Sequence, residues 1–461
     1  MFQEDTIAAI ATAVGEGGIG IVRLSGPDAI AVSGALFRAA SGATVSGQQS
    51  YRAAYGSIVD PISGQTVDEA LLLVMRAPRS YTREDVSEIH CHGGPLPLRR
   101  VLGLVLAAGV RLAEPGEFTK RAFLNGRLDL SQAEAVIDVI RAKTDASLRM
   151  AVGHLAGAFS DKVRAFRQEI LRLVAHLEAA IDFPEDDIEE LAARDVADAA
   201  DKLCADLDRL LATAQTGRIL REGLETVIIG KPNVGKSSLL NALLGEKRAI
   251  VTEIPGTTRD IIEEFVNIGG IPIKIVDTAG IRETADVVER IGVARAREAI
   301  AQADLILLLL DASAALANED KEVMSLLEGR PAIVLVNKTD LPAVIDLDEV
   351  HRHVAGKPVI KISALESTGV EELEQAIVEM VYSGQVSQPD GAFVNNVRHS
   401  RILQEARDRL ADALATVAAG MPPDCVVVDL RAAWEKLGEI TGETVGEDII
   451  DQIFTQFCIG K

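Results

Sequence analysis

An eight-residue segment near the middle of the 461-residue chain constrains its fold most strongly. Residues 230–237 read Gly-Lys-Pro-Asn-Val-Gly-Lys-Ser, follow a strand-like apolar run at 226–229 and lead into a helical stretch at 237–244. They match G-x-x-x-x-G-K-[ST], which in this context is typical of a phosphate-binding loop. Glycines let backbone N–H groups approach the anion, Lys236 adds a positive charge, and Ser237 offers a hydroxyl to magnesium. The segment predicts an α/β domain with a nucleotide site at a strand-to-helix turn.

Two downstream segments predict a site for magnesium and the terminal phosphate. Thr257 and Thr258 lie in a loop flanked by Pro and Gly, where a threonine could complete the magnesium coordination. Asp277-Thr-Ala-Gly ends the strand-like run 273–276, which would place a carboxylate near the metal and a glycine N–H near the phosphate. The next residue is Ile281, where a Ras-like enzyme carries a water-orienting glutamine. Hydrolysis therefore needs another carboxylate and another source of positive charge.

Two further motifs predict that the base is guanine. Asn337-Lys-Thr-Asp closes the apolar run 332–336, and Asp340 can accept hydrogen bonds from both N1–H and N2–H of guanine. Ser363-Ala-Leu follows the run 359–362 and fits a loop behind the base. The order of all these segments predicts a GTPase. The residues expected to contact GTP are Asn233, Val234, Gly235, Lys236, Ser237, Ser238, Thr252, Glu253, Ile254, Pro255, Gly256, Thr257, Thr258, Asp277, Thr278, Ala279, Gly280, Asn337, Lys338, Asp340, Ser363, Ala364 and Leu365.

Composition and length indicate a globular protein of about three domains. Apolar residues make up 48% of the chain and charged residues 25%. The longest strongly apolar runs, 101–110 and 305–310, are shorter than the roughly 20 residues that span a bilayer. The acidic start lacks a secretory signal, and the four cysteines lack the paired spacing of a disulfide framework. We therefore expect a cytoplasmic protein with no membrane span.

The charge distribution gives no overall attraction to nucleic acid, because the net charge is −22. Contact with tRNA would need a local basic patch or a partner. Basic residues gather at Lys120, Arg121, Arg127, Arg141, Lys143 and Arg149. Such a group is more typical of a solvated helix face than of a binding patch.

Changes in periodicity predict a multidomain α/β fold. Residues 1–118 contain short apolar runs broken by turns, which indicates a small α+β domain. Residues 119–217 are helical in pattern, residues 218–382 alternate strands and helices as in a Ras-like GTPase domain, and helical spacing returns at 383–461. One helical stripe comprises Leu128, Ala135, Val136, Val139 and Ile140. The pattern predicts a discontinuous all-α domain into which a GTPase domain with a mostly parallel sheet is inserted.

Short motifs along the whole chain resemble one protein family. They are Asp-Thr-Ile at 5–7, Gly-Ile-Gly-Ile-Val-Arg-Leu-Ser-Gly at 18–26, Tyr-Thr-Arg-Glu-Asp at 81–85, His-Gly-Gly at 92–94, Pro-Gly-Glu-Phe-Thr-Lys-Arg-Ala-Phe at 115–123, Leu-Asp-Leu at 128–130, Gly-Thr-Thr-Arg-Asp at 256–260 and Cys-Ile-Gly-Lys at 458–461. In these motifs the chain resembles the MnmE (TrmE) family of tRNA-modifying GTPases. The terminal motif combined with this N-terminal domain is highly specific.

The resemblance implies a homodimer whose N-terminal domains pair and bind 5,10-methylenetetrahydrofolate or 5-formyltetrahydrofolate. The folate contacts would be Arg23, Glu88, Arg127 and Lys461, although position 127 is a lysine in the family pattern. The side-chain chemistry agrees, because Arg and Lys can pair with the anionic glutamate tail and a carboxylate can bind the pterin edge bidentately. Cys458 would lie near the pterin as a catalytic residue whose chemical role the sequence leaves open.

The resemblance also implies the reaction. With an FAD-dependent partner of the MnmG (GidA) type, in a heterotetramer, the family adds a carboxymethylaminomethyl or aminomethyl group to carbon 5 of the wobble uridine of certain tRNAs. Potassium would supply the positive charge missing from the GTPase site, and Glu289 the carboxylate that positions water. The potassium ligands would be Asn233, Thr252, Ile254 and Thr257, and the magnesium ligands Ser237 and Thr258.

Three other interpretations share part of these observations. A regulatory GTPase switch in ribosome assembly or at a membrane would carry the same central motifs, but would not need the N-terminal domain or the terminal Cys-Ile-Gly-Lys. An assembly scaffold would not need the full set of nucleotide motifs. His90, Cys91 and His92 could suggest a metal site, yet alternation along a strand would direct Cys91 away from the two histidines. A turn at the end of a strand is the favoured interpretation of that segment.

Overall fold

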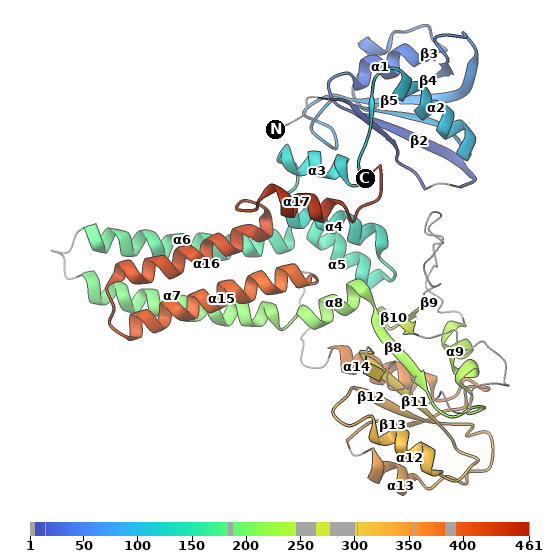
Figure 1. Cartoon of the computed structure of the whole chain (residues 1–461), viewed down its shortest axis with the longest axis vertical. Coiled ribbons are helices and arrows are strands. Elements are labelled where there is room, and N and C mark those ends of the chain that lie inside the picture. The colour runs from blue at the N-terminus through green and yellow to red at the C-terminus, as the bar shows by residue number, and fades with distance from the viewer. Residues whose placement is uncertain are drawn as a thin grey trace.

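The computed structural model describes residues 5–13, 15–182, 188–245, 264–276, 300–301, 303–354, 356–382 and 393–460. Figure 1 shows an N-terminal body of sheet and helices, an elongated helical body, and a second body built on a sheet, with the helical body between the other two. The predicted multidomain α/β fold class is therefore confirmed. Within the described ranges, no helix combines the length and the apolar character needed to cross a membrane.

The N-terminal body is a seven-stranded sheet with two helices packed on it. The order is β3-β4-β5-β6-β2-β1-β7, antiparallel except between β1 and β7. Alternate residues of β5 (Ala70, Leu72 and Val74) pack with Leu98 and Val101 of α2, as expected for a half-buried strand. The elements are β1 (Ile7–Ile10), β2 (Gly17–Ser25), α1 (Ala29–Leu36), β3 (Phe37–Ala39), β4 (Arg52–Val59), β5 (Thr66–Met75), β6 (Val86–Gly93), α2 (Pro95–Ala107) and β7 (Arg111–Leu112).

The helical body is built from two separate stretches of chain. Its main core joins Phe159 and Ile170 of α6 and Leu207 of α7 to Leu403 of α15 and Leu437 of α16. The helices are α3 (Glu117–Leu124), α4 (Leu130–Arg141), α5 (Asp145–Leu155), α6 (Ala158–Asp182), α7 (Ile188–Leu211), α8 (Ala214–Glu222), α15 (Val397–Ala418), α16 (Pro423–Thr441) and α17 (Glu447–Phe454). Because the core needs both stretches, the helical domain is discontinuous, as predicted.

The second sheet lies between these two stretches in sequence. Its order is β13-β12-β11-β8-β10-β9, parallel except for the pair β9–β10. The carboxyl ends of β8, β11, β12 and β13 therefore meet at one edge, where ligands bind in open α/β sheets. The elements are β8 (Leu224–Ile229), α9 (Lys236–Leu244), β9 (Glu264–Ile268), β10 (Ile271–Val276), β11 (Leu305–Asp311), α12 (Asn318–Ser325), β12 (Ala332–Asn337), α13 (Leu347–His353), β13 (Val359–Lys361) and α14 (Val370–Tyr382).

A buried polar cluster on α4 links the two halves of the helical body. Glu134 is 7% exposed, and its Oε2 accepts hydrogen bonds from His399 Nε2 and Arg398 Nη2, each at 2.7 Å. Burial alone would raise the pKa of Glu134, but the charges and hydrogen bonds of His399 and Arg398 lower that pKa to about 2.

The apolar stripe predicted for the helix α4 is partly wrong, because Ile140 is 45% exposed while Ile137 is buried.

We expect the helical body to lose stability as the pH falls from about 6.5 to about 4. Burial, followed by the charge of His399, lowers the pKa of His154 from its ordinary 6.5 to about 4. The unfolded chain therefore takes up this proton first, and falling pH favours unfolding. Between pH 7 and pH 5 the loss should be roughly 2 kcal/mol in the free energy of unfolding, measured from urea midpoints by circular dichroism.

The variant that tests this assignment is His154→Phe. The ring of His154 stacks on Phe159 at a centroid distance of 5.4 Å, so an aromatic ring without a titrating group suits the position. In this variant the free energy of unfolding should fall by roughly 2 kcal/mol less between pH 7 and pH 5 than in the wild type. The same pH dependence in the variant and the wild type would contradict the assignment to His154.

Candidate functional site

The turn between β8 and α9 has the geometry of a phosphate-binding loop. Gly230 (φ +147°) and Gly235 (φ +100°) both have positive φ. A Cβ on Gly230 would lie 2.5 Å from the carbonyl oxygen of Leu309, and one on Gly235 would lie 2.3 Å from Asn337 Nδ2. Larger residues therefore cannot be accommodated without shifting a neighbour. The loop delivers the chain directly into the N-terminus of α9, whose N–H groups favour anions.

The lysine of this loop is held against its own backbone. Lys236 Nζ donates to the carbonyl oxygens of Gly230 at 2.8 Å and Lys231 at 2.7 Å. Burial lowers the pKa of Lys236. Among the other residues predicted here, Val234 is buried, whereas Asn233, Ser237 and Ser238 are exposed. The loop therefore exposes polar side chains to solvent while Val234 is buried beneath it.

A single buried amide joins the three nucleotide loops that the structure describes. Asn337 Nδ2 donates to the carbonyl oxygen of Val234 at 2.7 Å, and its Oδ1 accepts from Ala364 N at 2.9 Å. Asp340 Oδ1 accepts from Ser363 Oγ at 2.7 Å, which orients the carboxylate predicted to recognise guanine. The structure thus brings together the loops around residues 234, 337 and 363. Leu365, at 81% exposure, lies at their surface.

Asp311 belongs to this site and was missed by the sequence analysis. Lys338, whose φ is +66°, donates from Nζ to Asp311 Oδ2 at 2.6 Å. Burial alone would raise the pKa of Asp311, but hydrogen bonds from Lys338 and Ser313 lower it. The available signal was its position directly after the apolar run 305–310, where the strand ends. The pair holds the lysine of the guanine motif in place.

Several predicted nucleotide-site residues lie outside the described residues, so they stay predictions. They are Thr252, Glu253, Ile254, Pro255, Gly256, Thr257, Thr258, Asp277, Thr278, Ala279, Gly280 and Glu289, and Lys461 of the N-terminal site shares that status.

The N-terminal body brings two of the four predicted folate contacts, Arg23 and Arg127, against one aromatic ring, and a third, Glu88, against Arg23. Arg23 and Glu88 are register partners on β2 and β6, and Arg23 Nε donates to Glu88 Oε1 at 2.8 Å. Burial alone would raise the pKa of Glu88, but His90 and Arg23 lower it. The guanidinium carbons of Arg23 and Arg127 lie 5.6 Å and 4.6 Å from the ring centroid of Tyr81. Tyr81 belongs to the Tyr-Thr-Arg-Glu-Asp motif at 81–85, but no contact with the folate was predicted for it.

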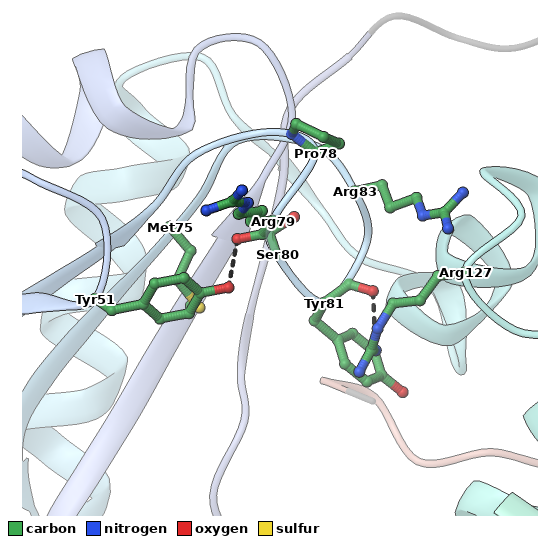
Figure 2. A pocket seen from close by; sticks show the side chains of 8 residues that line it. All are labelled: Tyr51, Met75, Pro78, Arg79, Ser80, Tyr81, Arg83 and Arg127. Carbon is green, nitrogen blue, oxygen red and sulfur yellow. Dashed lines mark hydrogen bonds between the residues drawn. The ribbon is translucent and has the colours of Figure 1, made fainter. Parts of the chain in front are cut away.

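A pocket of about 540 Å³ lies beside this ring. Figure 2 shows its lining side chains, with the guanidinium of Arg127 against Tyr81. The lining residues are Tyr51, Met75, Pro78, Arg79, Ser80, Tyr81, Arg83 and Arg127. Its volume is within the range of small-molecule sites in proteins.

The C-terminal tail returns to the same N-terminal body. Ile459 forms a β-bridge with Pro115, and the carbonyl oxygen of Cys458 accepts from Gly116 N at 3.3 Å. The carbonyl oxygen of Gly460 accepts from Arg23 Nη1 at 3.4 Å. Figure 1 shows the C-terminus beside this body, with the second sheet-containing body on the far side of the helical body. Cys458 is exposed and only two positions from the residue that contacts Arg23.

The side chains of residues 90–92 diverge. His90 Nε2 lies 3.2 Å from Glu88 Oε2, and His92 Nδ1 lies 2.6 Å from Asp68 Oδ1. Cys91 points into the core, and burial raises its pKa to about 11. No group of three or more His, Cys, Asp or Glu residues suited to a metal ion occurs in the described part of the chain.

Comparisons with known proteins cover the whole chain. A family model described as the MnmE helical domain matches residues 130–458, and one described as the GTP-binding protein TrmE N-terminus matches residues 6–127. The tRNA modification GTPase MnmE of Geobacillus kaustophilus is 55% identical, and the match covers 100% of both chains. The protein of that name from Bacillus subtilis is 52% identical over 99% of this chain and 100% of its own. Among solved structures, the G domain of the T. maritima FeoB iron transporter is 30% identical over 34% of this chain and 97% of its own, with a TM-score of 0.26.

Proposed function

Since this chain belongs to the MnmE family of tRNA modification GTPases, we propose which modification it makes. With a flavoprotein of the MnmG type, it adds a carboxymethylaminomethyl or aminomethyl group to carbon 5 of the wobble uridine, using a one-carbon unit from tetrahydrofolate. The observation that supports this most is that Arg23 and Arg127 both lie against Tyr81, while Glu88 and the tail that carries Cys458 both bond to Arg23. That arrangement joins a carboxylate, two guanidinium groups and a thiol-bearing segment in one region.

The residues present fit a folate chemically. Glu88, ionised and oriented by Arg23, can accept hydrogen bonds from the N–H edge of a pterin. Arg127 remains accessible for an anionic glutamate, because its Nη1 is bonded only to the carbonyl oxygen of Tyr81 at 3.0 Å among the described contacts. When bound, the folate would supply the one-carbon unit. Cys458 would be catalytic there, and Lys461 would add a further cationic contact.

We propose that the GTPase site holds magnesium and potassium. Ser237 and Thr258 would bind magnesium, and Asn233, Thr252, Ile254 and Thr257 would bind potassium. Asn233 fits this role because it carries an exposed amide, whose oxygen can bind a cation, on the phosphate loop. The ion would supply the positive charge that the site otherwise lacks, and Glu289 would position water.

We expect GTP turnover to be at least roughly tenfold faster in potassium buffer than in sodium buffer at equal ionic strength, because a size-selected ion supplies transition-state charge. Asn233→Ala should remove most of this difference, whereas Asn241→Ala, which removes an exposed amide from α9 outside the predicted contact set, should retain it. Phosphate release at saturating GTP measures both. Equal rates in the two salts would contradict the potassium proposal.

We propose that the protein acts in the cytoplasm as a homodimer that forms a heterotetramer with the flavoprotein. The N-terminal bodies of two copies would pair, which the family resemblance supports. Light scattering of the purified chain, with and without the flavoprotein, would give the two masses. A monomeric mass at micromolar concentration would contradict the homodimer.

The proposed modification is tested in cells that lack this chain. Mass spectrometry of wobble nucleosides should show loss of the 5-substituted uridines and their recovery when the wild-type gene is restored. Glu88→Gln should fail to restore them, because the amide cannot accept two hydrogen bonds from the pterin edge, yet it should keep GTPase activity. Unchanged nucleosides in the deletion strain would remove the proposed modification and leave the GTPase assignment intact.

A further inference from the structure

Three arginines without acidic partners gather in the pocket beside Tyr81. Arg79, Arg83 and Arg127 all line it, and none forms a salt bridge with a carboxylate within the described ranges. Arg83 Nη1 donates to the carbonyl oxygen of Asn125 at 2.9 Å, which uses one of the five N–H donors of its guanidinium. In a chain with a net charge of −22, such a cluster is a local site for anions.

The walls of the pocket are already formed. The hydroxyl of Tyr51 donates to the carbonyl oxygen of Arg79 at 2.6 Å, which fastens the loop after β5 to the start of β4. Tyr51 and Arg83 both have a φ of +61°, a left-handed conformation that residues with a side chain rarely adopt. Strain of this kind persists where the surrounding structure holds it, and it is common at ligand sites.

The pocket shares Arg127 with the proposed folate site. Tyr81 lines the pocket, and its ring contacts Arg127 on the pocket side and Arg23 of the Arg23–Glu88 pair. Figure 2 shows Arg83 and Arg127 on one side of the pocket and Tyr51 with Met75 on the other. A ligand that binds Glu88 with one end and Arg127 with a carboxylate would therefore direct its next groups toward Arg79 and Arg83.

We propose that this pocket binds the γ-glutamyl tail of a polyglutamylated tetrahydrofolate. This inference rests on the folate site proposed above. Each added γ-linked glutamate brings a net gain of one carboxylate, so a triglutamate carries two more than the monoglutamate, and these two match the guanidinium groups of Arg79 and Arg83. The preferred one-carbon donor would then be the polyglutamate form and not the monoglutamate.

A nucleic acid fits the surroundings of this pocket less well. A phosphate backbone needs basic residues along an extended surface. Beyond the pocket, Arg121 is buried and paired with Asp5 and Glu84, and Lys120 pairs with Asp451. The three arginines line one pocket of limited volume, which suits a short flexible polyanion.

The test compares the affinities of the full-length protein for the mono- and triglutamate forms of 5-formyltetrahydrofolate by calorimetry. We expect the triglutamate to bind roughly tenfold more tightly, and the ratio to shrink as salt is added. Arg79→Gln combined with Arg83→Gln should bring the ratio close to one and leave monoglutamate binding within about twofold of the wild type. Arg38→Gln, which removes an exposed arginine from β3, is the matched control and should preserve the ratio.

The possible outcomes distinguish failure of the tail site from failure of the proposed folate site. Equal binding of the two forms by the wild type would overturn the tail site while leaving the folate site standing. Failure of both forms to bind would overturn the proposed folate function itself. A double variant that weakens tRNA binding while keeping the triglutamate preference would assign the arginines to nucleic acid and overturn the inference.

Discussion

A Cys458→Ser variant is expected to abolish wobble-uridine modification while hydrolysing GTP at the wild-type rate. The residue lies in a tail that docks on the N-terminal body through Pro115, Gly116 and Arg23, and the GTPase body lies across the molecule. A thiol beside a one-carbon donor can act as nucleophile or acid, and a serine hydroxyl replaces it poorly in either role. Since the substitution only exchanges the sulfur for an oxygen and the docking contacts are made by the backbone, the docked tail should persist.

Mass spectrometry of wobble nucleosides and phosphate release at saturating GTP provide the two readouts. Cys425→Ser is the matched control, because Cys425 is a partly buried thiol on α16 with no proposed role. It should leave both readouts unchanged. Full modification by Cys458→Ser would exclude a chemical role for the thiol, and loss of GTP hydrolysis would show a structural one.

An Asp340→Asn variant should change the nucleotide preference from GTP to xanthosine triphosphate. The amide presents one donor and one acceptor in place of two acceptors, so GTP loses at least one charge-assisted hydrogen bond. That bond is worth roughly 1.5–3 kcal/mol, or about one to two orders of magnitude in affinity. Ser363 Oγ, 2.7 Å from Asp340 Oδ1, can still orient the new side chain because a hydroxyl also accepts hydrogen bonds.

Competition between the two nucleotides for binding, followed by fluorescence, measures this change. Asp348→Asn on α13 removes the same charge from an exposed helix and should not alter the preference. A variant that still prefers GTP would show that the loop does not recognise the base through Asp340.

The nucleotide site was predictable because its parts follow strands in fixed order. The strands before Gly230 and Asn337 appear where the apolar runs placed them, although β8 begins earlier, at Leu224. Glu225 obscured that start, since its polarity breaks the run; in the structure its side chain contacts Lys274 Nζ at 3.3 Å. The predicted family is confirmed by matches over the full chain.

Contacts between residues far apart in the sequence could not be predicted. Glu134 and His399 lie 265 positions apart, and neither residue alone predicts a buried ion pair. The stripe on α4 was assigned from apolar residues only, whereas the helix also buries Ser131, which bonds to Ser160 at 2.8 Å. A polar side chain on a buried face becomes intelligible only once its distant partner is known. The same limit hid Asp311, whose partner Lys338 belongs to another loop.

Because the helical core is divided between two stretches of chain, the bodies of the protein fold in a fixed order during translation. Each of the two sheets takes all its strands from one uninterrupted stretch, so both bodies can close while synthesis continues. Phe159, Ile170 and Leu207 leave the ribosome early, but their partners Leu403 and Leu437 emerge only near the end. Until then α6 and α7 expose an apolar face of the kind that chaperones bind. The nascent chain therefore depends most on protection in its helical body, after both flanking bodies have formed.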